Sequence, residues 1–298
     1  DAEEPVAVQP VVPVSPVLRT RSVTAMTGRD GSLYLGDETG KVWVVPQSAE
    51  TPQSHWFAHM GPIRQMHWLG QRLVTVSADG TVAEFNRDGI PEKRTRLNDH
   101  HLNAVALLPE GGLVVAADRG TVARLDVGHR WRSPAIHAQS AFAIAADPTG
   151  TSVASVGADG MLRVWDAKTG DQRLAWKGHQ GWATKVVWTT SAIWSAGSDG
   201  RLKRWTVTGK EALSLSASTK AITALMIVGD TVISGSELGE VRAFDARSGK
   251  LLWQQKIKGT VMSMASMSGA LYLGESNGVV SIWDMTNGRS RGTLRGSR

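Results

Sequence analysis

Three residues in the second half of the chain have the types of a catalytic triad. They are a histidine, a serine and an aspartate at His179, Ser195 and Asp199. In a serine hydrolase the histidine takes the proton of the serine hydroxyl, and the carboxylate orients the histidine and stabilises its charge. Under that interpretation Ser195 is the nucleophile. Whether it can act as one depends on the elements that position the three side chains.

Other kinds of chemistry find little support in the residue types. The chain has no cysteine, which excludes disulfides, thiolate zinc sites and cysteine nucleophiles. Of its eight histidines, His55 and His59 have the i, i+4 spacing of zinc proteases, but they flank a corner between strands and no helix is expected there, so a shared metal site is not the expected interpretation. The acidic turns at 36–40 and 274–278 have too few ligands for a calcium loop, and no glycine-rich phosphate motif opens a helix. We therefore expect no metal, no cofactor and no enzymatic activity.

The elements follow from a repeat. A glycine at the end of a tight turn recurs at intervals of 40, 40, 40, 40, 39 and 39 residues, at Gly40, Gly80, Gly120, Gly160, Gly200, Gly239 and Gly278. Each interval contains four short apolar runs, such as "AFAIAAD", "TSVASVG", "MLRVWD" and "QRLAWKG" between residues 141 and 178. Such runs, bounded by Gly, Asp, Asn or Pro, are typical of antiparallel strands joined by hairpins.

A four-stranded unit cannot bury both of its faces alone, but seven units can stack face to face around an axis. The sequence therefore predicts an all-β fold, a seven-bladed β-propeller of four-stranded antiparallel blades, over residues 19–298. Residues 1–18 form a proline-rich extended tail. Three roles stay open for this tail: it covers the seam between the first and last blades, binds a partner, or serves as a linker.

The units resemble WD40 repeats. The resemblance is carried by "VWDAKTGDQRLAWKGHQGW" (164–182), by "SIWDMTNGRSRGTLRG" (281–296) and by the turn "SAGSDGRLKRW" (195–205). Blade six, "TVISGSELGEVRAFDARSGKLLW" (231–253), instead resembles the repeat of quinoprotein-type propellers. The resemblance covers roughly residues 19–298 and implies the same propeller fold.

The WD40 resemblance implies a structural role for the triad-like residues. In such blades a histidine before the innermost strand, a serine or threonine on the second strand, the turn aspartate and a tryptophan on the third strand form a buried network. This pattern assigns one network to His179, Ser195, Asp199 and Trp205, and a second to His137, Ser155, Asp159 and Trp165. Buried polar groups paired in this way stabilise a blade and catalyse no reaction.

Function in a propeller resides on its faces and its central opening. The resemblance implies that ligands meet the narrow face, at residues flanking the start of each innermost strand and just before each turn aspartate. At these places we expect partner contacts from Arg64, Phe142, Trp182, Met262, Glu38 and Glu237. Large planar and apolar side chains are enriched at interface hot spots. The alternative for Phe142 and Trp182 is that they turn inward and pack between blades.

These observations favour a non-enzymatic interaction scaffold or an accessory subunit of a multiprotein assembly. It would bind a protein through the narrow propeller face, with the tail as a second candidate contact. The chain begins "DAEEPVAVQP", as a mature chain does after removal of a signal peptide, so we expect export to the bacterial periplasm. A trimmed, cytoplasmic chain is the alternative. No apolar run reaches the 18 residues of a membrane span.

Two other functions stay open. The quinoprotein-like blade allows an enzyme of the quinoprotein or lyase kind, although a quinone dehydrogenase needs a larger propeller and a calcium site that the sequence does not show. The net charge of +6 allows binding to nucleic acid or to an anionic surface. The basic residues that could form such a patch are Arg201, Lys203, Lys177 and Lys185. A solvated strand face explains them more simply, so nucleic acid is not the expected partner.

Overall fold

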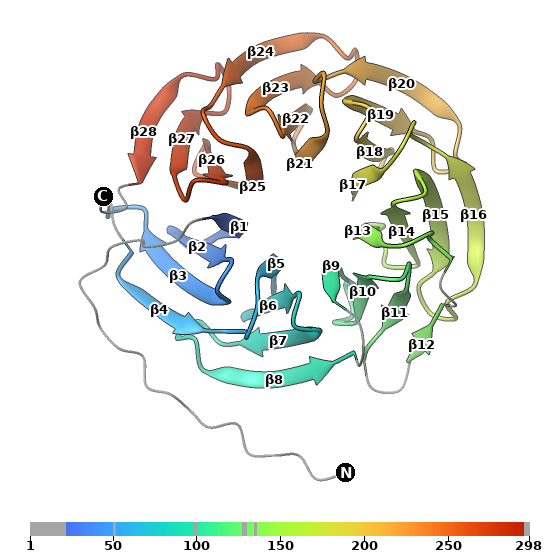
Figure 1. Ribbon diagram of the computed structural model, residues 1–298, viewed down its shortest axis with the longest axis horizontal. Coiled ribbons are helices and arrows are strands. Elements are labelled where there is room, and N and C mark those ends of the chain that lie inside the picture. The colour runs from blue at the N-terminus through green and yellow to red at the C-terminus, as the bar shows by residue number, and fades with distance from the viewer. Residues whose placement is uncertain (1–21, 50–51, 98–100, 127–129, 134–135, 295–298) are drawn as a thin grey trace.

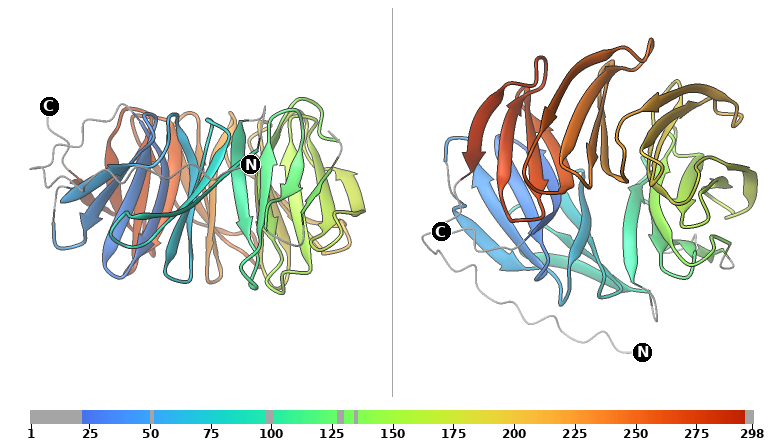
Figure 2. Two further views of the ribbon diagram at one scale, coloured as in Figure 1. Left: turned by 90° about the horizontal axis from the view of Figure 1, so that it is seen from below. Right: turned by 45° about the horizontal axis from the view of Figure 1, so that its top comes forward.

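The computed structural model describes residues 22–49, 52–97, 101–126, 130–133 and 136–294. Over these residues the chain forms seven four-stranded antiparallel sheets. The sheets stand around a central opening and form a disc, which Figure 1 shows along its axis and Figure 2 shows from the side. The predicted all-β fold of seven blades is confirmed. The predicted tail, residues 1–18, lies outside the described residues.

The strands of blades one to four follow one another in chain order. They are β1 (Val23–Arg29), β2 (Ser32–Asp37), β3 (Lys41–Pro46), β4 (Ser54–Phe57), β5 (Ile63–Leu69), β6 (Arg72–Ser77), β7 (Thr81–Phe85), β8 (Pro91–Arg96), β9 (Leu102–Leu107), β10 (Leu113–Ala117), β11 (Val122–Arg124), β12 (Trp131–Arg132), β13 (Ala141–Ala146), β14 (Ser152–Gly157), β15 (Met161–Asp166) and β16 (Gln172–Lys177).

Blades five to seven continue the same arrangement. Their strands are β17 (Ala183–Trp188), β18 (Ile193–Gly197), β19 (Arg201–Trp205), β20 (Glu211–Ser216), β21 (Ile222–Val228), β22 (Thr231–Ser236), β23 (Glu240–Asp245), β24 (Leu251–Lys256), β25 (Val261–Met267), β26 (Ala270–Glu275), β27 (Val280–Asp284) and β28 (Ser290–Leu294).

Each blade consists of four consecutive strands, with the first strand at the axis and the fourth at the rim (Figure 1). Because the strands are antiparallel, the fourth strand ends on the face where the first began. The loops between blades and the turns between second and third strands therefore share one face, which we call the inter-blade face. It contains the starts of all innermost strands and so corresponds to the predicted narrow face. The remaining turns lie on the opposite face.

The tight turns between second and third strands explain the regularly spaced glycines. Gly200 has a φ of 71°, a left-handed conformation that residues with a Cβ rarely adopt. A Cβ on Gly200 would also collide with the carbonyl oxygen of Ser218 in the next inter-blade loop. The same close approach to a following loop occurs at Gly40, Gly120, Gly160 and Gly239. Turn and loop thus meet backbone against backbone, which only glycine permits.

Apolar residues of neighbouring blades form a core in each interface. Successive residues of a strand point to opposite faces of its sheet, so one strand serves two interfaces. In β14, Val153 packs in the interface with blade three, and Ala154 packs in the interface with blade five. Ile193 of β18 is buried against Ala154 in the latter. A large apolar side chain buried in this way contributes about 1.5–3 kcal/mol.

At the rim, a tryptophan of one blade packs on a glycine of the next. Trp176 of β16 lies against Gly209, which has a φ of 84° in the turn between β19 and β20. The glycine lets the indole ring lie directly on the turn, because a Cβ there would come within 2.9 Å of the ring. The same contact recurs as Trp56 on Gly89, Trp131 on Gly170 and Trp253 on Gly288.

Each innermost strand begins with a β-bulge. In β5 the register with β6 shifts between Ile63 and Gln65, so the intervening Arg64 has no partner residue on β6. Bulges redirect side chains. The bulges of the innermost strands lie beside the axis, at the inter-blade face. The bulged residues include Thr24, Arg64, Phe142, Thr184, Thr223 and Met262.

Side-chain hydrogen bonds join the innermost strands around the axis. Thr223 Oγ1 donates to the Val261 carbonyl at 2.5 Å, which connects blades six and seven. Ser263 Oγ donates to the Val23 carbonyl at 2.9 Å, which connects blades seven and one. Every blade is formed by consecutive strands. The ring of described strands is therefore closed by side-chain packing and hydrogen bonds between β25 and β1, without a strand shared between the two ends.

Candidate functional site

The triad-like residues of blade five form one buried chain of hydrogen bonds. The Trp205 indole N–H donates to Ser195 Oγ at 2.9 Å, and Ser195 Oγ lies 2.7 Å from His179 Nε2. His179 Nδ1 lies 3.0 Å from Asp199 Oδ1. Because a carboxylate only accepts hydrogen bonds, Nδ1 carries the proton and Nε2 accepts the serine proton. The fold therefore brings together the four residues that the sequence assigned to one network.

Burial decides what this arrangement can do. Ser195 is 0% exposed, and His179, its hydrogen-bond partner, is buried as well. A substrate could reach the hydroxyl only if the blade opened. Asp199 meanwhile accepts the backbone N–H groups of Gln180, at 3.0 Å, and Arg201, at 3.1 Å. The network thus ties the inter-blade loop to the turn and to the second and third strands.

The carboxyl groups of these networks favour the ionised form. Burial alone would raise the pKa of Asp199, but the hydrogen bond and charge of His179 and the Arg201 N–H bring its pKa below the ordinary value. The pKa of Asp159 is lowered for the same reasons, with His137 as the partner. A carboxyl whose pKa is lowered by folding stabilises the protein above its unfolded pKa of about 3.9, and this stabilisation is lost as the pH falls.

Blade four repeats the network and adds a cation. Ser155 Oγ accepts the Trp165 indole N–H at 2.8 Å and lies 2.8 Å from His137 Nε2. His137 Nδ1 lies 2.9 Å from Asp159 Oδ1. Arg163 donates to the other oxygen of Asp159 at 2.8 Å. The second predicted set is therefore also gathered in one buried network.

Blades one and two contain variants of the network. In blade two His59 Nε2 lies 2.7 Å from Thr75 Oγ1, while Phe85 stands in place of the tryptophan and has no hydrogen to donate. Blade one uses Asp37, at the end of β2, whose carboxylate accepts the Trp43 indole N–H at 2.7 Å. The sequence reasoning missed this pair. A tryptophan on the third strand was the available signal, because its N–H needs an acceptor when buried.

Four of the partner contacts predicted on the inter-blade face, one cationic and three apolar, lie at two kinds of position. Arg64, Phe142 and Met262 occupy bulged positions and line the central channel. Trp182 precedes β17 and is 53% exposed. Its ring centre lies 5.6 Å from that of Phe142 in the neighbouring blade. Trp182 therefore does not turn inward, whereas Phe142 is half-buried beneath it.

Trp182 comes directly before the first residue of β17, whereas Arg64 comes directly after the first residue of β5. The bulged position of β17 belongs to Thr184, whose Oγ1 donates to the Ile222 carbonyl at 2.6 Å. The Thr184 hydroxyl therefore joins blades five and six. Counting from the turn glycine finds the start of the strand, but it does not distinguish a loop residue from a bulged residue.

The two predicted acidic contacts differ in exposure. Glu237 lies exposed in the turn between β22 and β23. Glu38 lies in the corresponding turn of blade one, but it is half-buried and its carboxylate accepts the Ser22 N–H at 2.9 Å. A partner on this face would therefore meet the Glu237 carboxylate more freely than that of Glu38.

Two exposed apolar side chains on this face were missed by the sequence reasoning. Met60, in the loop between β4 and β5, is 94% exposed, and Leu238, in the turn beside Glu237, is 40% exposed. The Met60 N–H donates to Asp79 at 2.9 Å, so its backbone is held while its side chain points to solvent. In the sequence, each of these residues is an apolar residue within a short polar loop or turn. That pattern occurs too often to identify an exposed contact residue.

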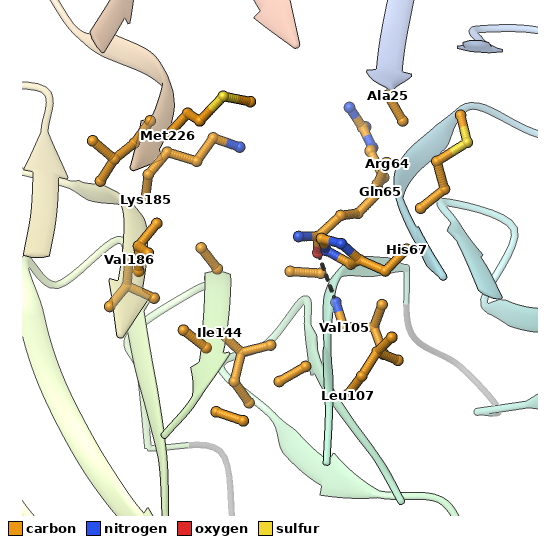
Figure 3. A pocket seen from close by; sticks show the side chains of 18 of the residues that line it. Ala25, Arg64, Gln65, His67, Val105, Leu107, Ile144, Lys185, Val186 and Met226 are labelled. Carbon is orange, nitrogen blue, oxygen red and sulfur yellow. Dashed lines mark hydrogen bonds between the residues drawn. The ribbon is translucent and has the colours of Figure 1, made fainter. Parts of the chain in front are cut away.

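The innermost strands of all seven blades enclose a channel of about 700 Å³ along the axis. Figure 3 shows part of its wall, where Lys185 of β17 and Arg64 of β5 point into the opening from opposite sides. Desolvation and the Arg64 charge lower the pKa of Lys185. Desolvation also lowers the pKa of His67 to about 4, so this residue is neutral at pH 7.

The basic surface patch that the sequence left open as an alternative does not form as one unit. Lys185 lies on the channel wall, and Lys203 Nζ pairs with the Glu211 carboxylate at 2.8 Å. Lys177 Nζ donates to the Asp159 carbonyl at 2.6 Å. The sequence suggested that these basic side chains could share one surface. In the structure Lys185 lies on an innermost strand, whereas Lys203 and Lys177 lie on strands farther from the axis.

The described residues also limit other kinds of site. Within these ranges, no three His, Asp or Glu side chains lie close enough together to hold a metal ion. Among the described residues that line the channel, the single carboxylate is that of Asp147. None of the described segments is a helix long and apolar enough to cross a membrane.

Comparison with known proteins identifies the family. Residues 78–295 match the family model PQQ_2, described as outer membrane protein assembly factor BamB. The match runs from the turn of blade two past the last strand of blade seven. It agrees with the quinoprotein-like character of blade six, whereas the WD40 resemblance is not confirmed. No curated protein matches the chain significantly. With well over half of its length matched, the chain belongs to the PQQ_2 family, outer membrane protein assembly factor BamB.

Proposed function

We propose that this protein is a non-enzymatic accessory subunit of a multiprotein assembly and that it binds a protein partner through its inter-blade face. The observation that carries this proposal is a set of apolar side chains exposed on that one face. They are Met60, Trp182 and Leu238. Single exposed apolar residues are common, but these three lie on short loops and turns with hydrogen-bonded backbone.

Anchored loops are suited to binding because they lose little conformational entropy when a partner docks. The Trp182 N–H donates to Ser198 Oγ at 2.9 Å, and its carbonyl accepts the Ser198 N–H at 2.8 Å. Met60 is held in a similar way by Asp79. Exposed Glu237 adds a charge beside Leu238 in the turn between β22 and β23. An aromatic and apolar centre with a charged rim is the composition of protein interfaces.

The non-enzymatic part of the proposal rests on the burial of both Ser-His-Asp sets. Their hydroxyl groups are fully engaged inside the blades and cannot attack a substrate. An enzyme of the quinoprotein or lyase kind is the alternative. An absorbance spectrum and a metal analysis of the purified protein separate the two, because either a bound chromophore or a stoichiometric metal would support an enzyme. We expect only the absorption of the protein itself.

The family description supports the cellular context. A chain of the outer membrane protein assembly factor BamB family is expected to work beside the outer membrane. We therefore place this protein in the periplasm, as a subunit that contacts a component of outer membrane protein assembly. The proline-rich residues 1–18 are a second candidate contact, which a chain lacking them would test.

The face can be tested by affinity recovery from a cell-envelope extract. The partner that the wild-type chain recovers is identified by mass spectrometry, and its affinity is then measured with purified variants. We expect Trp182→Ala and Met60→Ala each to weaken binding about tenfold or more, as truncation of interface anchors does.

The matched control is Val207→Ala. Val207 is 51% exposed, but it lies in the turn between β19 and β20 on the opposite face. This variant should bind as the wild type does. Equal affinities for the wild type, Trp182→Ala and Met60→Ala would remove the inter-blade face from consideration.

A further inference from the structure

The central channel has an uneven balance of charge. Among the described residues that line it, the cationic side chains are Arg64 and Lys185, and the single carboxylate belongs to Asp147. That carboxylate accepts hydrogen bonds within its own turn, from the Thr149 hydroxyl at 3.0 Å and the Thr151 N–H at 3.0 Å. It forms no ion pair with Arg64 or Lys185.

The two cations have no partner among the described residues. Neither the Lys185 ammonium nor the Arg64 guanidinium forms a hydrogen bond or an ion pair with them. Arg124, which is buried near the rim, shows the usual arrangement: its guanidinium pairs with Asp126 at 2.7 Å and with Glu110 at 3.2 Å. Arg64 is exposed into the opening, whereas Lys185 is half-buried on the channel wall. A cation held there without a counter-charge costs free energy, so the presence of Lys185 requires an explanation.

The side chains of Lys185 and Arg64 face each other across the central channel. Lys185 and Arg64 come from blades on opposite sides of the axis, and both side chains point into the opening (Figure 3). The Arg64 charge contributes to the lowered pKa of Lys185, which indicates that the two charges influence each other. Apolar residues such as Ile144 and Leu107 form the nearby wall.

We propose that the channel contains a binding site for a small oxyanion of the phosphate class, either free phosphate or a phosphate carried by a small organic molecule, held by Lys185 and Arg64. The proposal is independent of the protein-binding face, because it concerns the axis and a different set of side chains.

The chemistry of the site fits this class of ligand. A guanidinium presents paired N–H donors to phosphate oxygens, and an ammonium acts as a compact charge. A phosphate group at neutral pH carries between one and two negative charges, about 1.5 to 2 when it is esterified, which offsets most of the charge of two cations. A channel of about 700 Å³ lies within the range of pockets for small molecules, so there is space for an organic group against the apolar wall.

The test is isothermal titration calorimetry on the full chain at constant ionic strength. The probes are inorganic phosphate and glycerol 3-phosphate, with chloride as the balancing anion. We expect one site per chain. Lys185→Met and Arg64→Met keep most of the side-chain length and remove the charge, so each should weaken binding at least tenfold. Tighter binding of glycerol 3-phosphate than of phosphate would identify an organic phosphate as the better ligand.

Lys220→Met is the matched control. Lys220 is exposed in the loop before β21 on the inter-blade face, so the variant removes one charge from the same face without touching the channel. It should bind both probes as the wild type does. Absence of binding by the wild type overturns the proposal. Equal binding by the wild type, Lys185→Met and Arg64→Met also overturns it, because the anion would then sit elsewhere.

Thermal unfolding gives a second readout. Without phosphate, Lys185→Met should unfold at a higher temperature than the wild type, because it removes an uncompensated cation. Phosphate at about a hundredfold excess over the wild-type Kd should raise the wild-type Tm by about 5 °C and raise the Tm of Lys185→Met by at most about half as much. An equal rise in both proteins would contradict the proposal.

Discussion

The hydroxyl of Ser195 satisfies two buried neighbours at once, since it accepts the Trp205 N–H and donates to His179. Ser195→Ala would leave both partners without a hydrogen bond in the core. An unsatisfied buried polar group costs about 1–3 kcal/mol. We expect the free energy of unfolding to fall by that amount in urea denaturation.

Ser191→Ala is the control for this substitution, because Ser191 is exposed in the turn between β17 and β18. Asp199→Ala should also lower the Tm, since it releases the histidine and two backbone N–H groups. An unchanged Tm for Asp199→Ala would contradict a structural role for the network.

His67 makes stability depend on pH. Its pKa is about 4 in the folded protein and about 6.5 in an unfolded chain. Between these values the unfolded state binds more protons, so the free energy of unfolding falls as the pH is lowered from 6.5 towards 4. The loss from this residue is about 3 kcal/mol. Urea denaturation at pH 7 and pH 4.5 measures it.

His67→Gln removes this titration and keeps a side chain of similar size. The buried His59 and His137 also have lowered pKa values, and they act equally in both proteins, so the difference isolates His67. The variant should lose less stability than the wild type on acidification. Parallel loss in the two proteins would show that His67 is not held neutral by the channel.

At the scale of an element, the rim turns depend on a glycine beneath an indole ring. Gly209→Ala would force a Cβ into a left-handed backbone position and to within 2.9 Å of Trp176. The backbone costs about 1–2 kcal/mol, and overpacking adds about 1–3 kcal/mol. We expect the free energy of unfolding to decrease by the sum of the two in urea denaturation.

Gly229→Ala separates the two contributions. Gly229 has a φ of 56°, and a Cβ there would meet no atom within 4 Å, so this variant carries the backbone cost alone. It should be less destabilising than Gly209→Ala. Equal losses would mean that the indole ring moves aside freely and that the rim contact contributes nothing to blade packing.

The repeat predicted the strands better than it predicted their details. Alternating apolar residues and turn glycines are local signals, and they located blades such as β13 to β16 correctly. The bulge at the start of each innermost strand has no such signal, because it depends on pairing with the second strand. This is why Trp182, in a loop, and Arg64, in a bulge, were grouped as one kind of contact.

At the scale of the whole molecule, the ring is closed by contacts between β25 and β1. The Ser263 hydroxyl donates to the Val23 carbonyl across this seam. Ser263→Ala removes the donor and leaves a buried acceptor, so we expect the free energy of unfolding to fall by about 1 kcal/mol. Urea denaturation followed by tryptophan fluorescence measures the change.

Thr219→Ala serves as the control for the seam, because Thr219 is exposed in the loop before β21. It should leave the free energy of unfolding unchanged within about 0.5 kcal/mol. If Ser263→Ala behaves in the same way, packing alone closes the ring and the hydrogen bond is dispensable.

The sequence by itself determined the number of blades, the turns between their strands and the members of the two Ser-His-Asp networks. These features are encoded within single units of about forty residues, where strand alternation and left-handed glycines act locally. Blade one shows the limit, since its Asp37–Trp43 pair departs from the pattern of the other units.

Only the tertiary structure decided which side chains meet across the ring. Lys185 and Arg64 lie three blades apart, and they face each other because closure brings β17 and β5 to one axis. Closure likewise placed Met60 and Trp182 on a common face. Such neighbours depend on the curvature of the whole disc, which arises from the packing of all blades and from no single segment of the chain.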